Sequence, residues 1–206
     1  MKVVQINVTA NWGSTGRIAE DIGKMAILNG FDSIIAYSGR GNDSASKLIP
    51  IGNSLDTWIH GMKTRLLDKH GLSSKQATIN FIDKLKKIKP DLIHLHNIHG
   101  YYLNYPLLFN FLKEWGGPVV WTLHDCWAFT GHCAFYTYSQ CTKWQNQCFK
   151  CPNKSCYPAS LLMDRSYKNF INKKDSFLGL KNLTLVSVSK WLEQEVSKSF
   201  LKDYPN

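Results

Sequence analysis

Short apolar runs alternate with segments of helical periodicity along the whole chain. The apolar runs, such as VVWTL and LTLVSV, are typical of strands that are buried on both faces. Strands are expected over residues 3–8, 33–37, 91–96, 119–123 and 183–188, with a short one at 48–51 inside the Gly-, Ser- and Asn-rich segment 39–53. Helices are expected over residues 18–28, 55–66, 79–88, 105–115, 165–178 and 190–201, where apolar residues recur at helical spacing.

This alternation predicts an α/β fold, in which βαβ units form a parallel sheet that is flanked by helices. The chain has 206 residues, of which 44% are apolar, so it can bury one domain of this kind. We therefore expect residues 1–206 to form a single domain. In such sheets ligands bind beyond the carboxyl ends of the strands, so the functional residues should follow the strands.

The N-terminal segment MKVVQINVTAN alternates apolar with polar residues and predicts a strand, whereas a secretory signal would contain a continuous apolar block. No apolar run reaches the ~18 residues of a membrane span. These features favour a cytoplasmic location.

The first strand is followed by a turn rich in glycine and hydroxyl residues, namely Gly13, Ser14, Thr15, Gly16 and Arg17. Glycine lets a ligand approach the backbone closely, and the N-terminus of the helix that follows offers free N–H groups to a phosphate. The turn is neither a Walker A motif nor a GxGxxG fingerprint, and the same pattern also occurs in ordinary strand–helix turns.

Three histidines fall within six residues at the end of a later strand: His94, His96 and His99. His94 and His96 share one face of the strand, and His99 lies in the loop that follows. They could bind a metal, in which case the chain would be a zinc hydrolase, or they could line a cleft as hydrogen-bonding groups. We favour the cleft, because no carboxylate stands close in the sequence to complete a catalytic zinc site.

The next strand ends in His124 and Asp125. A histidine beside an aspartate could act as a general base with its orienting carboxylate. However, neighbouring residues on a strand point to opposite faces, so the two side chains need not touch. No serine or cysteine stands in a nucleophile elbow, which argues against a hydrolase triad.

The six cysteines all lie between positions 126 and 156. In a cytosolic protein such a cluster favours a metal over disulfides. Cys133, Cys141, Cys148 and Cys151 have the spacing C-x7-C-x6-C-x2-C, whose last part resembles a zinc knuckle. We expect them to bind one structural Zn²⁺, with free buried thiols as the alternative. Six aromatic residues crowd the same segment and could form its core or stack on a sugar: Trp127, Phe129, Phe135, Tyr136, Tyr138 and Trp144.

The chain carries a net charge of +10, and residues 54–90 hold eight Lys or Arg against three Asp. Such a surface attracts phosphate groups of nucleic acids, anionic lipids or nucleotide-linked substrates, although it can also be an ordinary solvated face. The same region contains an apolar stripe with Trp58, Ile59, Met62 and Leu66, and Lys63, Arg65 and Lys69 stand nearby. The stripe could lie in an anionic membrane interface, or it could pack on the sheet as core. We favour the core, because any crossover helix of an α/β fold shows such a stripe.

The Gly-rich turn, the segment LIHLHNIHGYY, the strand end TLHD and the segment SVSKWL together resemble the retaining GT-B glycosyltransferases of family 4. The resemblance covers essentially the whole chain and points to bacterial enzymes of capsule, exopolysaccharide or O-antigen assembly. It implies a Rossmann-like domain that forms the N-terminal, acceptor-side half of a GT-B hexosyltransferase. The Cys-rich segment, about 126–156, would be an insertion in it. The C-terminal half of the family, which holds the nucleotide-sugar, is not part of the 206 residues, so we expect this chain alone to be inactive.

The resemblance also implies roles for single residues. The turn from Gly13 to Arg17 would approach the donor diphosphate, and His124 would contact the donor sugar near the reacting carbon. His96, His99, Tyr101 and Asp125 would line the acceptor cleft. The family needs no catalytic metal and no protein nucleophile. The partners would be a nucleotide-sugar and a glycan or lipid-linked acceptor at the inner face of the plasma membrane. The alternative is a basic zinc-knuckle module that binds nucleic acid.

Overall fold

The computed structural model describes residues 1–206 and is built around a six-stranded sheet whose neighbouring strands are all parallel. Across the sheet the strands are β5 (Lys47–Pro50), β3 (Asp32–Tyr37), β1 (Lys2–Ile6), β6 (Leu92–Leu95), β7 (Val119–Leu123) and β8 (Leu183–Ser187). Counted along the chain, this is the order 3-2-1-4-5-6 of a doubly wound, Rossmann-like sheet. The predicted α/β fold is confirmed. The strand order reverses between β1 and β6. Sheets of this kind bind ligands beyond the carboxyl ends of the strands, beside such a reversal.

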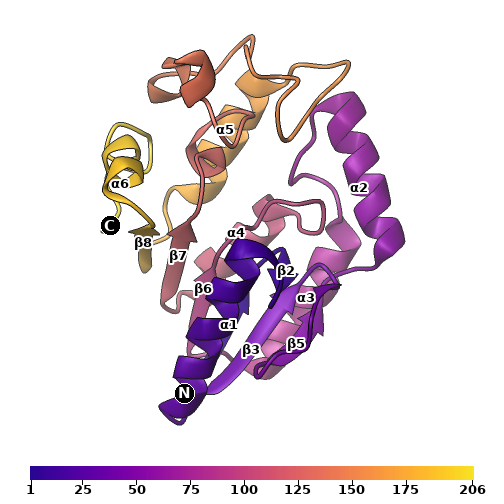
Figure 1. Cartoon of the computed structure of the whole chain (residues 1–206), viewed down its shortest axis with the longest axis vertical. Coiled ribbons are helices and arrows are strands. Elements are labelled where there is room, and N and C mark those ends of the chain that lie inside the picture. Colours follow the sequence, from indigo (N-terminus) through magenta and orange to yellow (C-terminus); the bar gives the residue numbers. More distant parts are fainter.

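Six helices connect and cover the strands (Figure 1): α1 (Gly13–Leu28), α2 (Ser54–Leu67), α3 (Lys75–Ile88), α4 (Tyr105–Trp115), α5 (Ser166–Phe177) and α6 (Lys190–Val196). Their ends follow the local sequence. The Asn104 side chain accepts a hydrogen bond from Leu107 N–H at the start of α4, and Gly116 ends this helix in the left-handed conformation at φ 68°. The last helix ends at Val196 and not near 201, because the Ser199 hydroxyl accepts the Leu201 N–H in the turns that follow.

The main core is a cluster of 39 buried residues, in which the rings of Phe109, Trp121 and Phe177 pack at tilted and edge-on angles across α4, β7 and α5. The central strand β1 is completely buried from Val4 to Ile6, including the polar residue Gln5. A two-stranded parallel ribbon, β2 (Thr9–Ala10) with β4 (Arg40–Gly41), was not expected from the sequence. It forms where the first strand ends two residues early, since the Asn7 amide donates to the Thr9 carbonyl.

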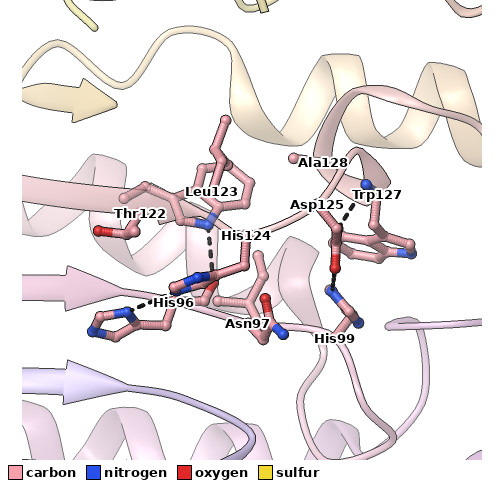
Figure 2. A pocket seen from close by; sticks show the side chains of 11 residues that line it. His96, Asn97, His99, Thr122, Leu123, His124, Asp125, Trp127 and Ala128 are labelled. Atoms are coloured by element: carbon pink, nitrogen blue, oxygen red, sulfur yellow. Dashed lines mark hydrogen bonds and ion pairs between the residues drawn. The ribbon is translucent and has the colours of Figure 1, made fainter. Parts of the chain in front are cut away.

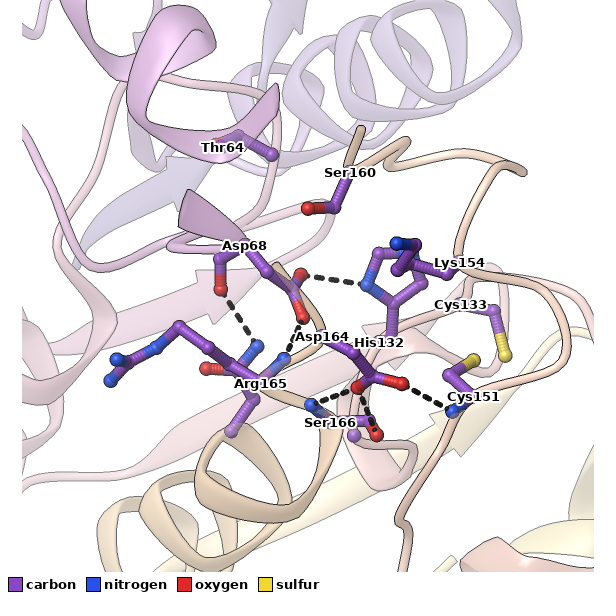
Figure 3. Close-up of polar contacts among 12 residues, drawn as sticks. Thr64, Asp68, His132, Cys133, Cys151, Lys154, Ser160, Asp164, Arg165 and Ser166 are labelled. Atoms are coloured by element: carbon purple, nitrogen blue, oxygen red, sulfur yellow. Dashed lines mark hydrogen bonds and ion pairs between the residues drawn. The ribbon is translucent and has the colours of Figure 1, made fainter. Parts of the chain in front are cut away.

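The segment between β7 and α5, residues 124–165 and here called the Cys loop, contains only three 3₁₀ turns: Trp127–Phe129, Thr137–Ser139 and Lys143–Gln145. Of its six aromatic residues noted above, Phe135 and Tyr138 are exposed and the other four are buried. The loop is anchored to α2 by Asp68, whose carboxylate contacts His132 Nδ1 at 2.7 Å and accepts the Arg165 N–H at 2.7 Å (Figure 3). Both side chains of the Asp68–His132 pair are fully buried.

Helix α2 is inverted in the sense that it buries its polar face, whereas an ordinary helix of this fold buries its apolar face. It buries the polar residues His60 and Thr64 and leaves Leu55, Trp58 and Met62 exposed. The interpretation that its apolar stripe packs on the sheet is therefore wrong. The buried polar groups are satisfied locally, since the His60 ring contacts the Ser74 hydroxyl and accepts the Gly71 N–H.

Candidate functional site

Three histidines from two neighbouring strand ends stack at the carboxyl edge of the sheet. His94 and His96 come from the end of β6, with ring centroids 4.2 Å apart. His124 follows β7, with its ring centroid 5.5 Å from that of His96, and Figure 2 shows these two residues. The three rings meet because β6 and β7 are hydrogen-bonded neighbours. His94 and His96 point to the same side because alternate residues of a strand share one face.

A chain of hydrogen bonds fixes the proton positions in this stack. The Gln5 amide donates to the Ala19 carbonyl, so its oxygen must accept from His96 Nε2–H at 3.0 Å. A neutral His96 then accepts at Nδ1 from His124 Nε2–H, 3.2 Å away. A neutral His124 consequently has a free lone pair on Nδ1. His124 is only partly buried, so it can accept a hydrogen bond from a bound hydroxyl group.

A second group lies beside the histidine stack. His99 Nε2 contacts Asp125 Oδ2 at 2.9 Å, and His99 Nδ1 contacts the Tyr157 hydroxyl at 3.2 Å. The other Asp125 oxygen accepts the Trp127 N–H, and the Trp127 ring packs 5.0 Å from that of His99. His124 thus contacts His96, whereas Asp125 contacts His99, because neighbouring residues of a strand point to opposite faces.

The two groups share one small cavity of about 10 Å³, which is the space of about one water molecule. Its lining brings together four of the residues singled out from the sequence, His96, His99, His124 and Asp125, with Trp127.

Two other sequence-derived sets lie apart from this cavity. Tyr101 packs against His60 and His70, with ring centroids 6.0 and 5.2 Å apart. The turn from Gly13 forms the start of α1, where no side chain caps the free N–H groups and Arg17 is exposed. Gly16 is required there, because a Cβ would come within 2.7 Å of Thr9 Oγ1.

Sequence reasoning missed several residues of this region, namely Gln5, His70, Thr122, Tyr157 and Lys173. Gln5 lies inside an apolar strand, and its polarity at a buried position was the available signal. His70 and Tyr157 carry no local signal, since they reach the site from distant loops. His70 accepts the Gly100 N–H at Nε2 and has no partner at its buried Nδ1.

Burial controls the charge of the histidine stack. It lowers the pKa of His94 to about 4 and the pKa of His96 to about 2, and the neighbouring histidines add to the effect. Burial also lowers the pKa of His124, although the charge of Asp125 opposes it. Burial by itself would raise the pKa of Asp125, but the charge and hydrogen bond of His99 outweigh it and hold that pKa below its ordinary value. At neutral pH the stack of His94, His96 and His124 is therefore neutral, and Asp125 is a carboxylate.

No group of three or more His, Cys, Asp or Glu side chains in the structure is arranged as the ligands of a metal. His94 contacts the Thr122 hydroxyl, and His96 and His99 are engaged as described, so these three histidines do not form a hydrolase metal site. The four expected zinc cysteines line a second cavity, in the Cys loop, and are considered below.

No family model matches the chain. Among curated proteins, it is 26% identical over 189 residues to WcaC of Escherichia coli (strain K12), a candidate colanic acid biosynthesis glycosyl transferase. The match covers 86% of this chain and 45% of that protein, so this chain spans less than half the length of its relative. Over most of its length the chain is thus similar to a glycosyltransferase.

Among solved structures, the chain resembles the ADP-L-glycero-D-manno-heptose-6-epimerase of Helicobacter pylori, at 12% identity and a TM-score of 0.39. The match covers 90% of this chain and 53% of that one. A likeness of this degree carries no argument about function.

We expect acid to destabilise the protein before its carboxylates are protonated. The pKa of His94 and His96 is 6.5 when unfolded and about 4 and about 2 in the fold, so only the unfolded chain takes up these protons as the pH falls below 6.5. The histidine contribution is complete above pH 6.5 and is lost as the pH falls, by up to about 1.4 kcal/mol per pH unit for each residue. Urea unfolding between pH 7 and pH 4.5 measures this.

The His94→Gln variant is the control, since glutamine can still bond to Thr122 but does not titrate. Its unfolding free energy should fall less steeply with acid than that of the wild type. Equal slopes for the two proteins would show that His94 is not held neutral.

Proposed function

We propose that this chain is the acceptor-side half of a GT-B glycosyltransferase that moves a sugar from a nucleotide-sugar to a glycan or lipid-linked glycan. The observation that carries the proposal is the cavity at the strand ends, where His124 presents a free Nδ1 beside the His99–Asp125 pair. The similarity to a glycosyltransferase of polysaccharide assembly supports it. As in family 4, transfer would proceed with retention and without a protein nucleophile.

The donor diphosphate would lie at the start of α1. The first N–H groups of this 16-residue helix have no side-chain cap, and no acidic residue stands in its first turn. Both features favour an anion, because the helix N-terminus carries partial positive charge. Ser14 and Arg17 are exposed there and can add a hydroxyl and a guanidinium to the backbone donors.

The sugar ring and the acceptor would meet at the cavity. His124 Nδ1 would accept a hydrogen bond from a hydroxyl of the donor sugar, since its Nε2–H is directed to His96. On the other side, the His99–Asp125 pair would orient the acceptor hydroxyl that attacks. The Trp127 ring beside His99 provides an apolar wall of the kind on which sugar rings pack.

The substrate's lipid part would explain the inverted helix α2. Four of its apolar residues are exposed by 37–64% (Leu55, Trp58, Ile59 and Met62), and three more follow in the Cys loop at 45–69% (Leu161, Leu162 and Met163). The two segments are adjacent, because Leu161 N–H donates to the Arg65 carbonyl at 2.7 Å (Figure 1).

Basic residues surround these apolar side chains. Lys63 and Arg65 are exposed on α2, and Lys154 precedes the apolar residues of the Cys loop. An apolar face with a basic border fits an anionic lipid surface. None of the helices has the length and apolar content of a membrane span, so the proposed association is peripheral.

Nucleotide-sugars should bind weakly to the purified chain, through the diphosphate at α1 and the sugar at His124. Saturation-transfer NMR with a panel of UDP- and GDP-sugars measures both contacts. We expect Arg17→Glu to weaken binding by about tenfold, which is about 1.4 kcal/mol. His124→Ala should remove saturation of the sugar protons while the nucleotide protons keep theirs.

The matched control is Lys181→Glu, which makes the same charge change in the turn before β8, at the opposite edge of the sheet. It should bind like the wild type. If no nucleotide-sugar in the panel receives saturation from the wild type, the proposed donor contacts are wrong.

The chain alone should not turn over any nucleotide-sugar. Its site has one wall, and transfer requires both substrates to be aligned with water excluded. Release of nucleoside diphosphate in the presence of glycan acceptors measures turnover. Turnover by the wild type that disappears in His124→Ala would overturn this expectation.

The protein should sediment with anionic vesicles and remain in solution with zwitterionic ones. Each basic residue near an anionic surface contributes about 1 kcal/mol, so reversing two charges in Lys63→Glu with Arg65→Glu should release the protein. Trp58→Ser should weaken binding as well, because it removes apolar area that would be buried in lipid.

The double variant Lys86→Glu with Lys87→Glu, at the C-terminal end of α3, is the control with the same change in net charge. It should still sediment. Equal recovery of the wild type in both supernatants at low salt would exclude the membrane face.

A further inference from the structure

The Cys loop contains a second cavity, separate from the histidine site, that is lined by four of the six cysteines: Cys133, Cys141, Cys148 and Cys151. Its volume of about 10 Å³ is the space of about one water-sized sphere. The remaining cysteines, Cys126 and Cys156, do not line it. The fold thus selects from the six cysteines one quartet that lines a single cavity.

Two sulfur atoms of this quartet have N–H groups directed at them. Cys133 and Cys151, 18 positions apart in the sequence, both line the cavity and are drawn in Figure 3. The Gly131 N–H donates to Cys148 Sγ at 3.2 Å, and the Asn153 amide lies 3.9 Å from Cys133 Sγ. N–H donors directed at sulfur stabilise the negative charge that a metal-bound thiolate keeps.

The backbone around the cavity is built to hold these positions. Gly131 has no room for a side chain, because a Cβ would overlap the Ser166 carbonyl oxygen and the Cβ of Cys148. In the tight turn between Cys148 and Cys151, Lys150 adopts a left-handed φ of 44°. The Lys143 ammonium donates to the carbonyls of Phe149 and Lys150, at 3.1 Å each, and so closes the turn.

The charge around the cavity suits an anionic metal centre. Zn²⁺ with four thiolates carries two negative charges, and burying them requires nearby cations. Lys143 lines the cavity itself. Lys173, which is fully buried on α5, has no carboxylate within salt-bridge distance, and its ammonium donates to the carbonyl of Thr130, a residue that also lines the cavity.

We propose that Cys133, Cys141, Cys148 and Cys151 bind one structural Zn²⁺, which fixes the Cys loop against the candidate site. Zinc favours such a tetrahedral set of four thiolates. In the structure the four cysteines line one cavity, but no three of them have ligand spacing. Binding would therefore draw their sulfurs inward, toward the cavity that they already line.

The metal would act on the site through the loop. A loop of this length, residues 124–165 with only three 3₁₀ turns, has no strand or α-helix of its own to keep its shape. It nevertheless carries Trp127 and Tyr157, which contact His99 at the cavity of the site. The proposal rests on the geometry of the Cys loop and stands whether or not the chain takes part in sugar transfer.

Metal analysis of protein produced with zinc in the medium tests the proposal. We expect about one zinc per chain, and intense thiolate-to-metal charge-transfer bands when cobalt replaces it. Cys148→Ser should lower the zinc content by at least about tenfold. Cys156→Ser is the matched control, because this exposed cysteine lies outside the cavity, and it should keep its zinc.

Thiol alkylation followed by mass analysis separates zinc from the other states, even if Cys148→Ser fails to fold. With zinc, the quartet should resist alkylation until a chelator is added, and the chelator should lower the melting temperature of the wild type and of Cys156→Ser. Disulfides within the quartet would overturn the proposal. So would free thiols in a metal-free, equally stable protein, or zinc retained in folded Cys148→Ser.

Discussion

A buried ammonium group holds the segment on which the candidate site depends. Lys173 on α5 donates to the carbonyls of Trp127 and Thr130 at 2.6 and 3.0 Å, and it lies 3.6 Å from the centre of the Trp127 ring. Burial lowers the pKa of Lys173 to about 7, so its position requires these partners. Trp127 N–H in turn fixes Asp125, and Asp125 fixes His99. One side chain on a covering helix thereby sets the geometry at two strand ends.

The sequence predicted the strands and the edge where the site lies, because apolar runs and the polar residues that follow them are local signals. It also placed His94 and His96 on one face, as the stack confirms. It could not predict which groups would pair, because pairing depends on the order of strands in the sheet. His124 reaches His96 and not Asp125 only because β7 lies beside β6 in this register. Gln5, which bonds to His96, lies on β1 and precedes it by 91 residues in the sequence.

Helix α2 gives a clearer example of what hydrophobic periodicity cannot predict. A stripe of apolar residues predicts that a helix has two faces, but not which of them is buried. Here the polar face is buried, since His60 and Thr64 find partners within residues 60–74 and Asp68 finds partners far along the chain. Asp68 is satisfied by His132 and by the N–H of Arg165, 64 and 97 residues away. Such partners cannot be inferred from local spacing, and without them these polar groups would be exposed and the apolar stripe buried.

The site therefore has two kinds of support. The histidine stack stands on strands of the central sheet, whose backbone is fixed by ladders on both sides. The wall formed by Trp127 and Tyr157 belongs to the Cys loop, which joins no ladder of the sheet. It is anchored to the helices by Asp68 after α2, by Lys173 on α5 and by the bond from Leu161 N–H to the Arg65 carbonyl. Such separate anchors are lost more readily than a sheet, because each depends on one or two hydrogen bonds. A change in the loop should therefore alter the wall beside His99 while the stack of His94, His96 and His124 keeps its geometry.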